Sequence, residues 1–121
     1  MLHLSPACNY YLYQGNTDMR KGFDSLSGMV STHMQRSVLS GSVFIFLNKK
    51  HNQVKLLLWE GDGFALYYKR LEKGTYELPA PADKNQSISI SSQQLQLILQ
   101  GISLKSVQRR KRYQHTGIKS G

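Results

Sequence analysis

VKLLLWEGDGFALYYKRLEKGTY, at residues 54–76, is the strongest strand-turn-strand pattern in this chain. Residues 54–59 and 64–70 are rich in aliphatic and aromatic side chains, which favour β-strands. Between them, Gly61 and Gly63 supply the backbone freedom of a tight turn. The pattern therefore predicts a β-hairpin. A dinucleotide-binding loop is excluded, because it needs a third glycine and a helix immediately afterwards.

Both faces of this hairpin are substantially apolar. Alternate residues of a strand point to opposite sides, so Tyr68 and Arg70 share one face while Tyr67 and Lys69 share the other. We expect Tyr67 and Lys69 to project beside Trp59. An antiparallel sheet of this composition cannot leave either face wholly in water. One face is therefore expected to carry a helix, and the other a second layer, a closed barrel or a partner.

Three further segments are expected to extend the sheet. Residues 9–13 are rich in tyrosine and predict a short strand, after which residues 14–16 turn the chain. Residues 43–47 predict a strand that joins the hairpin through a polar turn at residues 48–52. Three consecutive antiparallel strands result, and residues 75–78 predict a short fourth one.

A helix is predicted between the first two strands, because apolar side chains recur every three or four residues at Met19, Phe23, Leu26, Val30 and Met34. It would begin at Met19, with Thr17 or Asp18 accepting hydrogen bonds at its N-terminus. Arg20 and Lys21 would then occupy the first turn, where the helix dipole disfavours cations. Either these cations and the free N–H groups form a phosphate-sized anion site, or Asp24 pairs with them on a solvated surface.

The chain beyond residue 78 predicts a connector, a strand and a second helix. Residues 79–86 have the composition of an exposed connector. Residues 88–90 alternate like an edge strand. Ser91 and Gln94 form a capping-box signature before an apolar helical face, and Gly101 fits as the terminator of that helix.

These segments predict an α+β fold. We expect an antiparallel β-meander of three to five strands packed against one main helix, with a short C-terminal helix and a basic tail. A single domain would span residues 1–102, divided into a sheet module to residue 78, a connector at 79–87 and a C-terminal strand and helix at 88–102. Residues 103–121 would form a basic tail.

The charge balance favours a polyanionic partner. Sixteen Lys and Arg residues against seven Asp and Glu give a formal net charge of +9, which favours nucleic acid or an anionic membrane surface. No apolar run approaches the roughly 20 residues of a bilayer span, and no secretion signal is present. We therefore expect a cytoplasmic protein without membrane contact. The single cysteine, Cys8, excludes an internal disulfide.

Catalytic residues are not evident. Metal-dependent phosphoryl chemistry would need two or three carboxylates that converge on divalent ions, whereas cap, surface and turn positions account for Asp18, Asp24, Glu60 and Asp62. The histidines and Cys8 show no metal-ligand spacing with one another. We expect no enzymatic activity, no metal and no cofactor.

Two basic segments are candidates for phosphate contact. Lys69, Arg70 and Lys73 cluster at one end of the predicted sheet, beside tyrosines that either stack bases or are simply packed. Residues 103–121 carry six of the sixteen positive charges and no acid. This segment is either a solvated terminus or an arm that neutralises phosphates through Arg109, Arg110, Lys111 and Arg112.

A family resemblance joins several of these segments. TDMRKGFDSL at residues 17–26, SGSVFIF at 40–46, WEGDGF at 59–64 and YYKRLEKG at 67–74 together resemble the TnpB accessory proteins encoded by the second open reading frame of insertion-sequence-66 elements. The similarity covers about residues 10 to 102. It implies a bacterial protein that assists transposition alongside a separate transposase, which carries the cleavage and joining chemistry. The resemblance transfers no catalytic residues.

The leading hypothesis is a non-catalytic module that binds element-end DNA, or DNA held by the transposase, and is nucleoid-associated when bound. Its candidate DNA-binding residues are Arg20, Lys21, Lys69, Arg70, Lys73, Arg109, Arg110, Lys111 and Arg112. The alternative is an adaptor that docks the transposase through an apolar, tyrosine-rich sheet face that the helix leaves uncovered. A third hypothesis is a small nuclease using Asp18, Asp24, Asp62 or Glu72. A homo-oligomer is a further expectation about partners.

Overall fold

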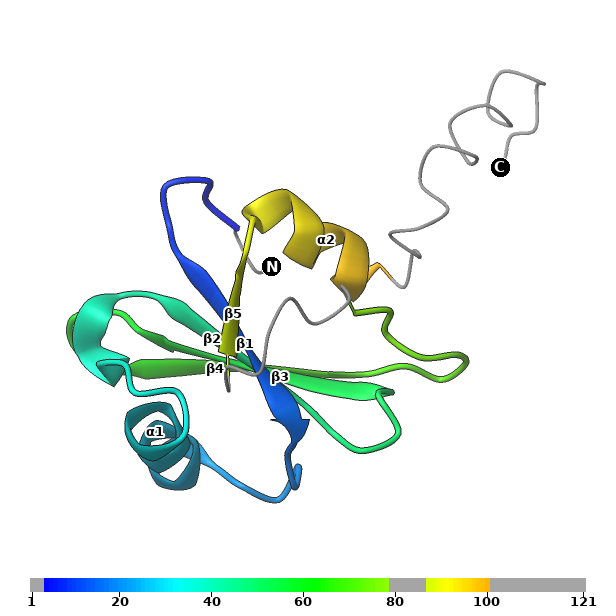
Figure 1. The fold of residues 1–121 in the computed structure, drawn as a ribbon, viewed down its shortest axis with the longest axis horizontal. Helices are drawn as coiled ribbons and strands as arrows, with labels where there is room; N and C mark the ends of the chain where they lie inside the picture. The colour runs from blue at the N-terminus through cyan, green and yellow to red at the C-terminus, as the bar shows by residue number, and fades with distance from the viewer. Residues whose placement is uncertain (1–3, 79–86, 101–121) are drawn as a thin grey trace.

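A computed structural model describes residues 4–78 and 87–100 of the chain. They form a five-stranded sheet of order β4-β3-β2-β1-β5 with two α-helices (Figure 1). The elements in chain order are β1 (Tyr10–Asn16), α1 (Phe23–Thr32), the 3-10 helix η1 (Val38–Ser40), β2 (Val43–Leu47), β3 (Gln53–Trp59), β4 (Phe64–Arg70), β5 (Ser87–Ile90) and α2 (Ser92–Leu99). The predicted α+β class is confirmed.

The predicted hairpin is β3 and β4. Its turn closes with the Glu60 N–H donating to the Gly63 carbonyl at 2.8 Å, while Gly61 takes a φ of 95° that favours glycine. This turn sets Trp59 opposite Phe64, on the same face as Tyr68. The prediction that Tyr67 and Lys69 project beside Trp59 is therefore wrong, because both lie on the opposite face.

The N-terminal strand β1 lies inside the sheet. It pairs in parallel with β2 on one side and antiparallel with β5 on the other. Residues 14–16 were predicted as a turn but continue β1 to Asn16, with an irregularity in register between Leu12 and Asn16. The parallel pair was not predicted from the sequence; it arises because α1 and η1 return the chain along the sheet before β2 begins.

A helix covers each face of the sheet, and Figure 1 shows α1 and α2 on opposite sides of it. Under α1, the buried side chains are Leu26, Met29, Val30, Met34, Phe44, Phe46 and Leu57. Under α2, they include Tyr10, Leu12, Ile45, Leu56, Leu95 and Ile98. The second face of the sheet is thus covered by α2. Within residues 4–78 and 87–100 the sheet does not close into a barrel, and β4 and β5 lie at its edges.

The second helix and its strand follow the prediction. The Ser91 hydroxyl accepts the Gln94 N–H at 3.0 Å, and the Gln94 side chain accepts the Ser91 N–H at 2.9 Å, which completes the capping box. The predicted edge strand is β5. Gly101, the connector at 79–86 and the tail lie outside the described residues. Neither α1 nor α2 has the length and hydrophobicity that crossing a bilayer requires.

Residues 75–78 do not form the predicted fourth strand. Instead, Tyr76 is buried and its N–H donates to the His51 carbonyl at 2.7 Å. Desolvation, with a smaller contribution from Tyr67, raises the pKa of Tyr76 to about 12. The segment is fixed against the β2–β3 turn by one aromatic anchor and not by strand pairing.

Candidate nucleic-acid interface

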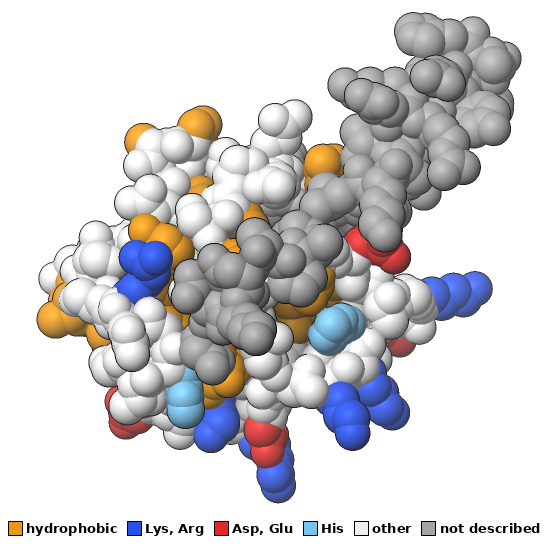
Figure 2. Space-filling model, viewed as in Figure 1, with side chains coloured by type: hydrophobic (Ala, Val, Ile, Leu, Met, Phe, Trp, Pro, Cys, Tyr) orange, Lys and Arg blue, Asp and Glu red, His pale blue; other side chains and the backbone are white. Residues whose placement is uncertain are grey.

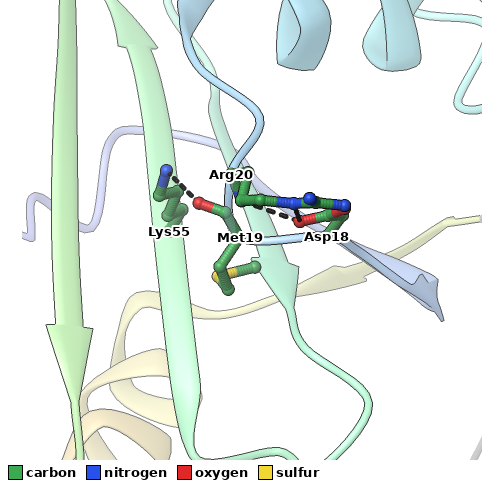
Figure 3. Close-up of polar contacts among 4 residues, drawn as sticks. All are labelled: Asp18, Met19, Arg20 and Lys55. Carbon is green, nitrogen blue, oxygen red and sulfur yellow. Dashed lines mark hydrogen bonds and ion pairs between the residues drawn. The ribbon is translucent and has the colours of Figure 1, made fainter.

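The segment between β1 and α1 follows the sheet and is not helical. The Thr17 N–H donates to the Leu47 carbonyl at 2.8 Å. Lys55, which is only 8% exposed, then donates from Nζ to the Met19 carbonyl at 2.7 Å (Figure 3). The same Nζ also donates to the Lys21 carbonyl at 2.8 Å. These contacts satisfy carbonyls that a helix starting at Met19 would turn toward its own backbone. They explain why α1 begins at Phe23 and not at Met19.

Arg20 pairs with Asp18 ahead of the helix. Arg20 Nη2 lies 2.6 Å from Asp18 Oδ2, and the Arg20 backbone N–H donates to Asp18 Oδ1 at 2.9 Å (Figure 3). The Arg20 side chain, mainly through its hydrogen bonds, holds the pKa of Asp18 well below its usual range. Asp18 therefore caps a turn and not the helix, whose N-cap is Gly22 without a side-chain cap.

The expected cation-bearing first turn of α1 is wrong, because Arg20 and Lys21 precede the helix. The predicted phosphate-sized anion site required both cations in the first turn of the helix, so the structure gives it no support. The alternative, in which Asp24 pairs with the two cations, is also wrong: among the described residues the ion pairs are Arg20–Asp18 and Arg70–Glu72.

The three cations at the end of β4 have different surroundings. Lys69 lies on the α2 face, and its Nζ donates to the Leu99 carbonyl at 3.1 Å, where the helix dipole favours a cation. Arg70 lies on the α1 face and makes a long ion pair of 3.6 Å with Glu72; both side chains are mostly exposed. Lys73 is exposed in the following turn.

This turn lies against the one between β2 and β3. The Leu71 N–H donates to the Asn52 carbonyl at 2.8 Å, and the Tyr76 N–H bonds the adjacent His51 carbonyl. The 48–52 turn carries Lys49 and Lys50, which are both exposed. Sequence reasoning missed these two lysines as candidates, although a polar turn with adjacent lysines directly before the hairpin was a usable signal.

The segment at residues 17–21 leaves the same end of the sheet, since Asn16 pairs with Leu47 and the Thr17 N–H bonds the Leu47 carbonyl just before the 48–52 turn. Three separate segments thus bring six cations to this end, here named the basic end: Arg20, Lys21, Lys49, Lys50, Arg70 and Lys73. The carboxylates Asp18 and Glu72 are interleaved with them. Figure 2 shows Lys and Arg side chains gathered around these turns, at the right and lower right of the view, with a few Asp and Glu side chains among them. The β3–β4 turn, which carries Glu60 and Asp62, lies at the opposite end of its strands.

The exposed aromatic side chains lie on the α1 face. Tyr68 is 52% exposed, and Lys55 Nζ lies 5.0 Å from the centre of its ring. Phe23 is 44% exposed and stacks on Phe64 at 6.4 Å, and Phe64 packs edge-on against Trp59 at 4.9 Å. The exposed tyrosine of the hairpin is thus Tyr68, whereas Tyr67 packs against the core beneath α2.

The carboxylates of the nuclease hypothesis do not converge. Asp18 and Glu72 are engaged with Arg20 and Arg70 at the basic end, whereas Asp62 lies in the turn at the other end of β4. Asp24, the fourth candidate, lies in the first turn of α1. Within residues 4–78 and 87–100, no three His, Cys, Asp or Glu side chains are grouped so that they could hold a metal ion.

Comparison with known proteins gives a family match over most of the chain. The family described as "IS66 Orf2 like protein" matches residues 8–109. "Uncharacterized protein y4hO" of Sinorhizobium fredii is 33% identical over 98 residues, which is 81% of this chain and 84% of the relative. "Uncharacterized protein y4jC" of the same organism is 26% identical over 93 residues, covering 77% of this chain and 78% of the relative. No solved structure matches the chain significantly.

Proposed function

The chain belongs to the IS66 Orf2-like family of accessory proteins associated with IS66 transposition, and on this premise we propose that it binds the DNA of the element ends, free or held by the transposase, without cutting it. The basic end supplies the contacts. Lys49, Lys50 and Lys73 are exposed, and no carboxylate of the described residues forms an ion pair with them.

The observation that carries the proposal is the contact between two lysine-bearing segments. The Leu71–Asn52 and Tyr76–His51 backbone hydrogen bonds hold the 71–76 segment against the turn that carries Lys49 and Lys50. Cations fixed on neighbouring turns can neutralise successive phosphates and release their counterions, and this term supplies most sequence-independent affinity for DNA.

The other candidate residues contribute differently in this proposal. Arg20 and Arg70 each pair with a carboxylate, so each contributes less positive electrostatic potential at the surface than an unpaired cation does. Lys69 stabilises the end of α2 and is a structural residue first. Arg109, Arg110, Lys111 and Arg112 lie outside the described residues; we include them as a second phosphate-binding element, to be tested separately.

The direct test is a fluorescence anisotropy titration of a labelled duplex of the element end at about 50 mM salt. Replacing Lys49, Lys50 and Lys73 together by Gln removes three charges and should weaken binding by at least tenfold, since each lost phosphate contact reduces counterion release. The matched control is Arg36→Gln: Arg36 is an exposed cation whose guanidinium carbon lies 3.7 Å from the centre of the Tyr11 ring, away from the basic end.

The control variant should bind within about twofold of the wild type, because it removes no phosphate contact. Equal losses in Lys73→Gln and Arg36→Gln would show that only net charge matters and would contradict a localised interface. A chain neutralised at residues 109–112, measured alone and in combination, separates that segment from the folded part.

Removing the carboxylates that lie among the cations should increase the affinity for DNA, which provides a second test. Asp18→Asn keeps a side chain that can accept the Arg20 N–H but removes the charge that neutralises Arg20, and Glu72→Gln does the same for Arg70. Each variant should bind duplex DNA several-fold more tightly than the wild type, since one more cation becomes available to phosphate. Unchanged affinity in both would place the interface elsewhere.

A second candidate function, docking of the transposase as an adaptor, is favoured by the exposed Phe23, stacked on Phe64, and by Tyr68 on the same face. Exposed aromatic side chains of this kind are typical anchors of protein interfaces. Co-purification with the transposase that survives nuclease treatment and high salt, and is lost in Phe23→Ser, would support it. Co-purification abolished by nuclease would leave DNA as the link between the two proteins.

A further inference from the structure

Among the described residues, the strand β4 lies at one edge of the sheet. Within the described part of the chain it has a strand neighbour, β3, on one side only. The Glu60 N–H bonds the Gly63 carbonyl, and the Leu71 N–H bonds the Asn52 carbonyl, so the alternating odd-numbered residues of β4 direct their backbone groups toward β3. The backbone groups of Phe64, Leu66 and Tyr68 consequently point away from the sheet, available to another strand.

The side chains along β4 are complementary to those of a second, antiparallel copy of the same strand. If β4 pairs antiparallel with a second β4 about Leu66, then Phe64 lies opposite Tyr68 of the second copy, and Asp62, in the turn just before β4, comes beside Arg70 of the second copy. Each such pair occurs twice because of the two-fold symmetry. On the other face, Tyr67 lies opposite the small Ala65. The arrangement joins aromatic with aromatic and carboxylate with guanidinium, which are the cross-strand pairs that stabilise antiparallel sheets.

Other registers are less favourable. A two-residue shift that centres the pairing on Tyr67 sets Asp62 opposite Glu72 of the second copy, where like charges repel. The opposite shift, centred on Ala65, leaves only residues 64–66 of β4 opposite strand residues of the second copy, because β4 begins at Phe64. The Arg70–Glu72 ion pair is long and exposed, so Arg70 can exchange this partner for Asp62 at little cost.

We propose that the occupant of the β4 edge is a second copy of this chain, paired antiparallel about Leu66 with Asp62–Arg70 ion pairs at both ends. Such pairing covers an edge that the described residues leave unpaired, and unpaired edges are prone to non-specific association. It joins two sheets into one and carries one basic end at each end of the central strand pair. The proposal does not depend on DNA binding.

The test is a charge exchange read by light scattering after size exclusion, on nuclease-treated full-length protein. The wild type should approach twice the 13.8 kDa of one chain as concentration rises. Asp62→Arg and Arg70→Asp should each stay near the mass of one chain at concentrations where the wild type is dimeric, because each sets like charges opposite each other. An equimolar mixture of the two variants should regain the dimer mass, since opposite charges then meet at both ends.

Matched controls change the same charges at neighbouring exposed positions. Glu60→Arg lies on the β3 side of the turn and Lys73→Asp lies beyond β4, so both should dimerise as the wild type does. Hydrogen exchange of the wild type provides a reading without substitutions: the amides of Leu66 and Tyr68 should gain protection with rising concentration. A monomer at every concentration, or a mixture that fails to regain the dimer mass, would overturn the proposal.

Discussion

The two helices of this protein begin for different reasons. The N-terminus of α2 is specified within four residues, by the reciprocal hydrogen bonds of Ser91 and Gln94. The N-terminus of α1 has Gly22 as its N-cap, with no side-chain cap, and its start is set by Lys55 on β3, which holds the Met19 and Lys21 carbonyls. A local signal fixes one helix, and a contact across 34 residues or more fixes the other.

This difference determines what each basic segment can do. Because Lys55 holds residues 19–21 along the sheet, the Arg20 side chain meets Asp18 in a turn and not a helix dipole. The segment between β1 and α1, at residues 17–22, is therefore held at the basic end by side-chain hydrogen bonds from Lys55. Lys69 differs from Arg20, because its Nζ donates to the Leu99 carbonyl at the C-terminal end of α2. Its charge therefore stabilises the helix and is less accessible to a ligand.

The largest expected effect comes from breaking the tertiary contact. Lys55→Met keeps the aliphatic part of the side chain but leaves two carbonyls without their charged donor, which should lower the free energy of unfolding by about 3 kcal/mol. Urea denaturation followed by circular dichroism measures it. Lys69→Met, which removes one partly exposed bond to a carbonyl, is the matched control and should cost about 1 kcal/mol or less. Equal losses would mean that Lys55 has no special role.

Breaking the local signal should cost less. Ser91→Ala removes the acceptor for the Gln94 N–H and should lower the free energy of unfolding by about 1 kcal/mol, a typical value for the loss of an N-cap. The same urea titration measures the change, with Ser92→Ala as the control because Ser92 follows the cap position. A loss in Ser91→Ala no larger than in the control would show that the capping box is not what stabilises α2.

The comparison is sharpened by giving α1 the cap that α2 has. Gly22 has an extended backbone that any residue adopts, and a Cβ added there meets no atom within 4 Å. Gly22→Ser should therefore raise the free energy of unfolding by a few tenths of a kcal/mol. Thermal denaturation detects this as a small rise in Tm. A fall would mean that the Gly22 backbone is needed for the lead-in as it stands.

The smallest effect concerns pH. The pKa of Asp18 is lowered in the folded chain, so its contribution to stability is present above the unfolded pKa of about 4 and is lost as the pH falls toward the folded pKa. The wild type should be more stable than Asp18→Asn at pH 6, and the difference should shrink steadily below pH 4. A difference that is constant between pH 6 and pH 2.5 would contradict the Asp18–Arg20 pairing.

Much of the fold followed from signals that lie close together in the sequence. The hairpin turn, the β2 strand and the Ser91 capping box were predicted because each is specified by a few adjacent residues. The parallel pairing of β1 with β2 and the start of α1 were missed, because Asn16 meets Leu47 and Met19 meets Lys55 only in the folded chain. The apolar spacing from Met19 to Phe23 was real, yet tertiary hydrogen bonds outweighed it.

In the candidate site, too, features specified by adjacent residues were predicted, whereas features that depend on tertiary contacts were missed. The basic segments were identified from composition, and Lys69, Arg70 and Lys73 were correctly taken to adjoin the end of the sheet. The partners of Arg20 and Lys69 were not foreseen, and Lys49 and Lys50 were overlooked. The sheet face on which Trp59 lies could have been predicted from the sequence, since a four-residue EGDG turn sets Trp59 opposite Phe64.

The central claim is that cations of the basic end contact DNA phosphates, and the salt dependence of binding tests it most directly. Plotting log K against log salt for the wild type should give a negative slope of about 0.9 per phosphate neutralised. Joint replacement of Lys49, Lys50 and Lys73 by Gln should flatten that slope by about two to three, whereas Arg36→Gln should leave it unchanged. A slope that stays the same after the triple replacement would contradict the account.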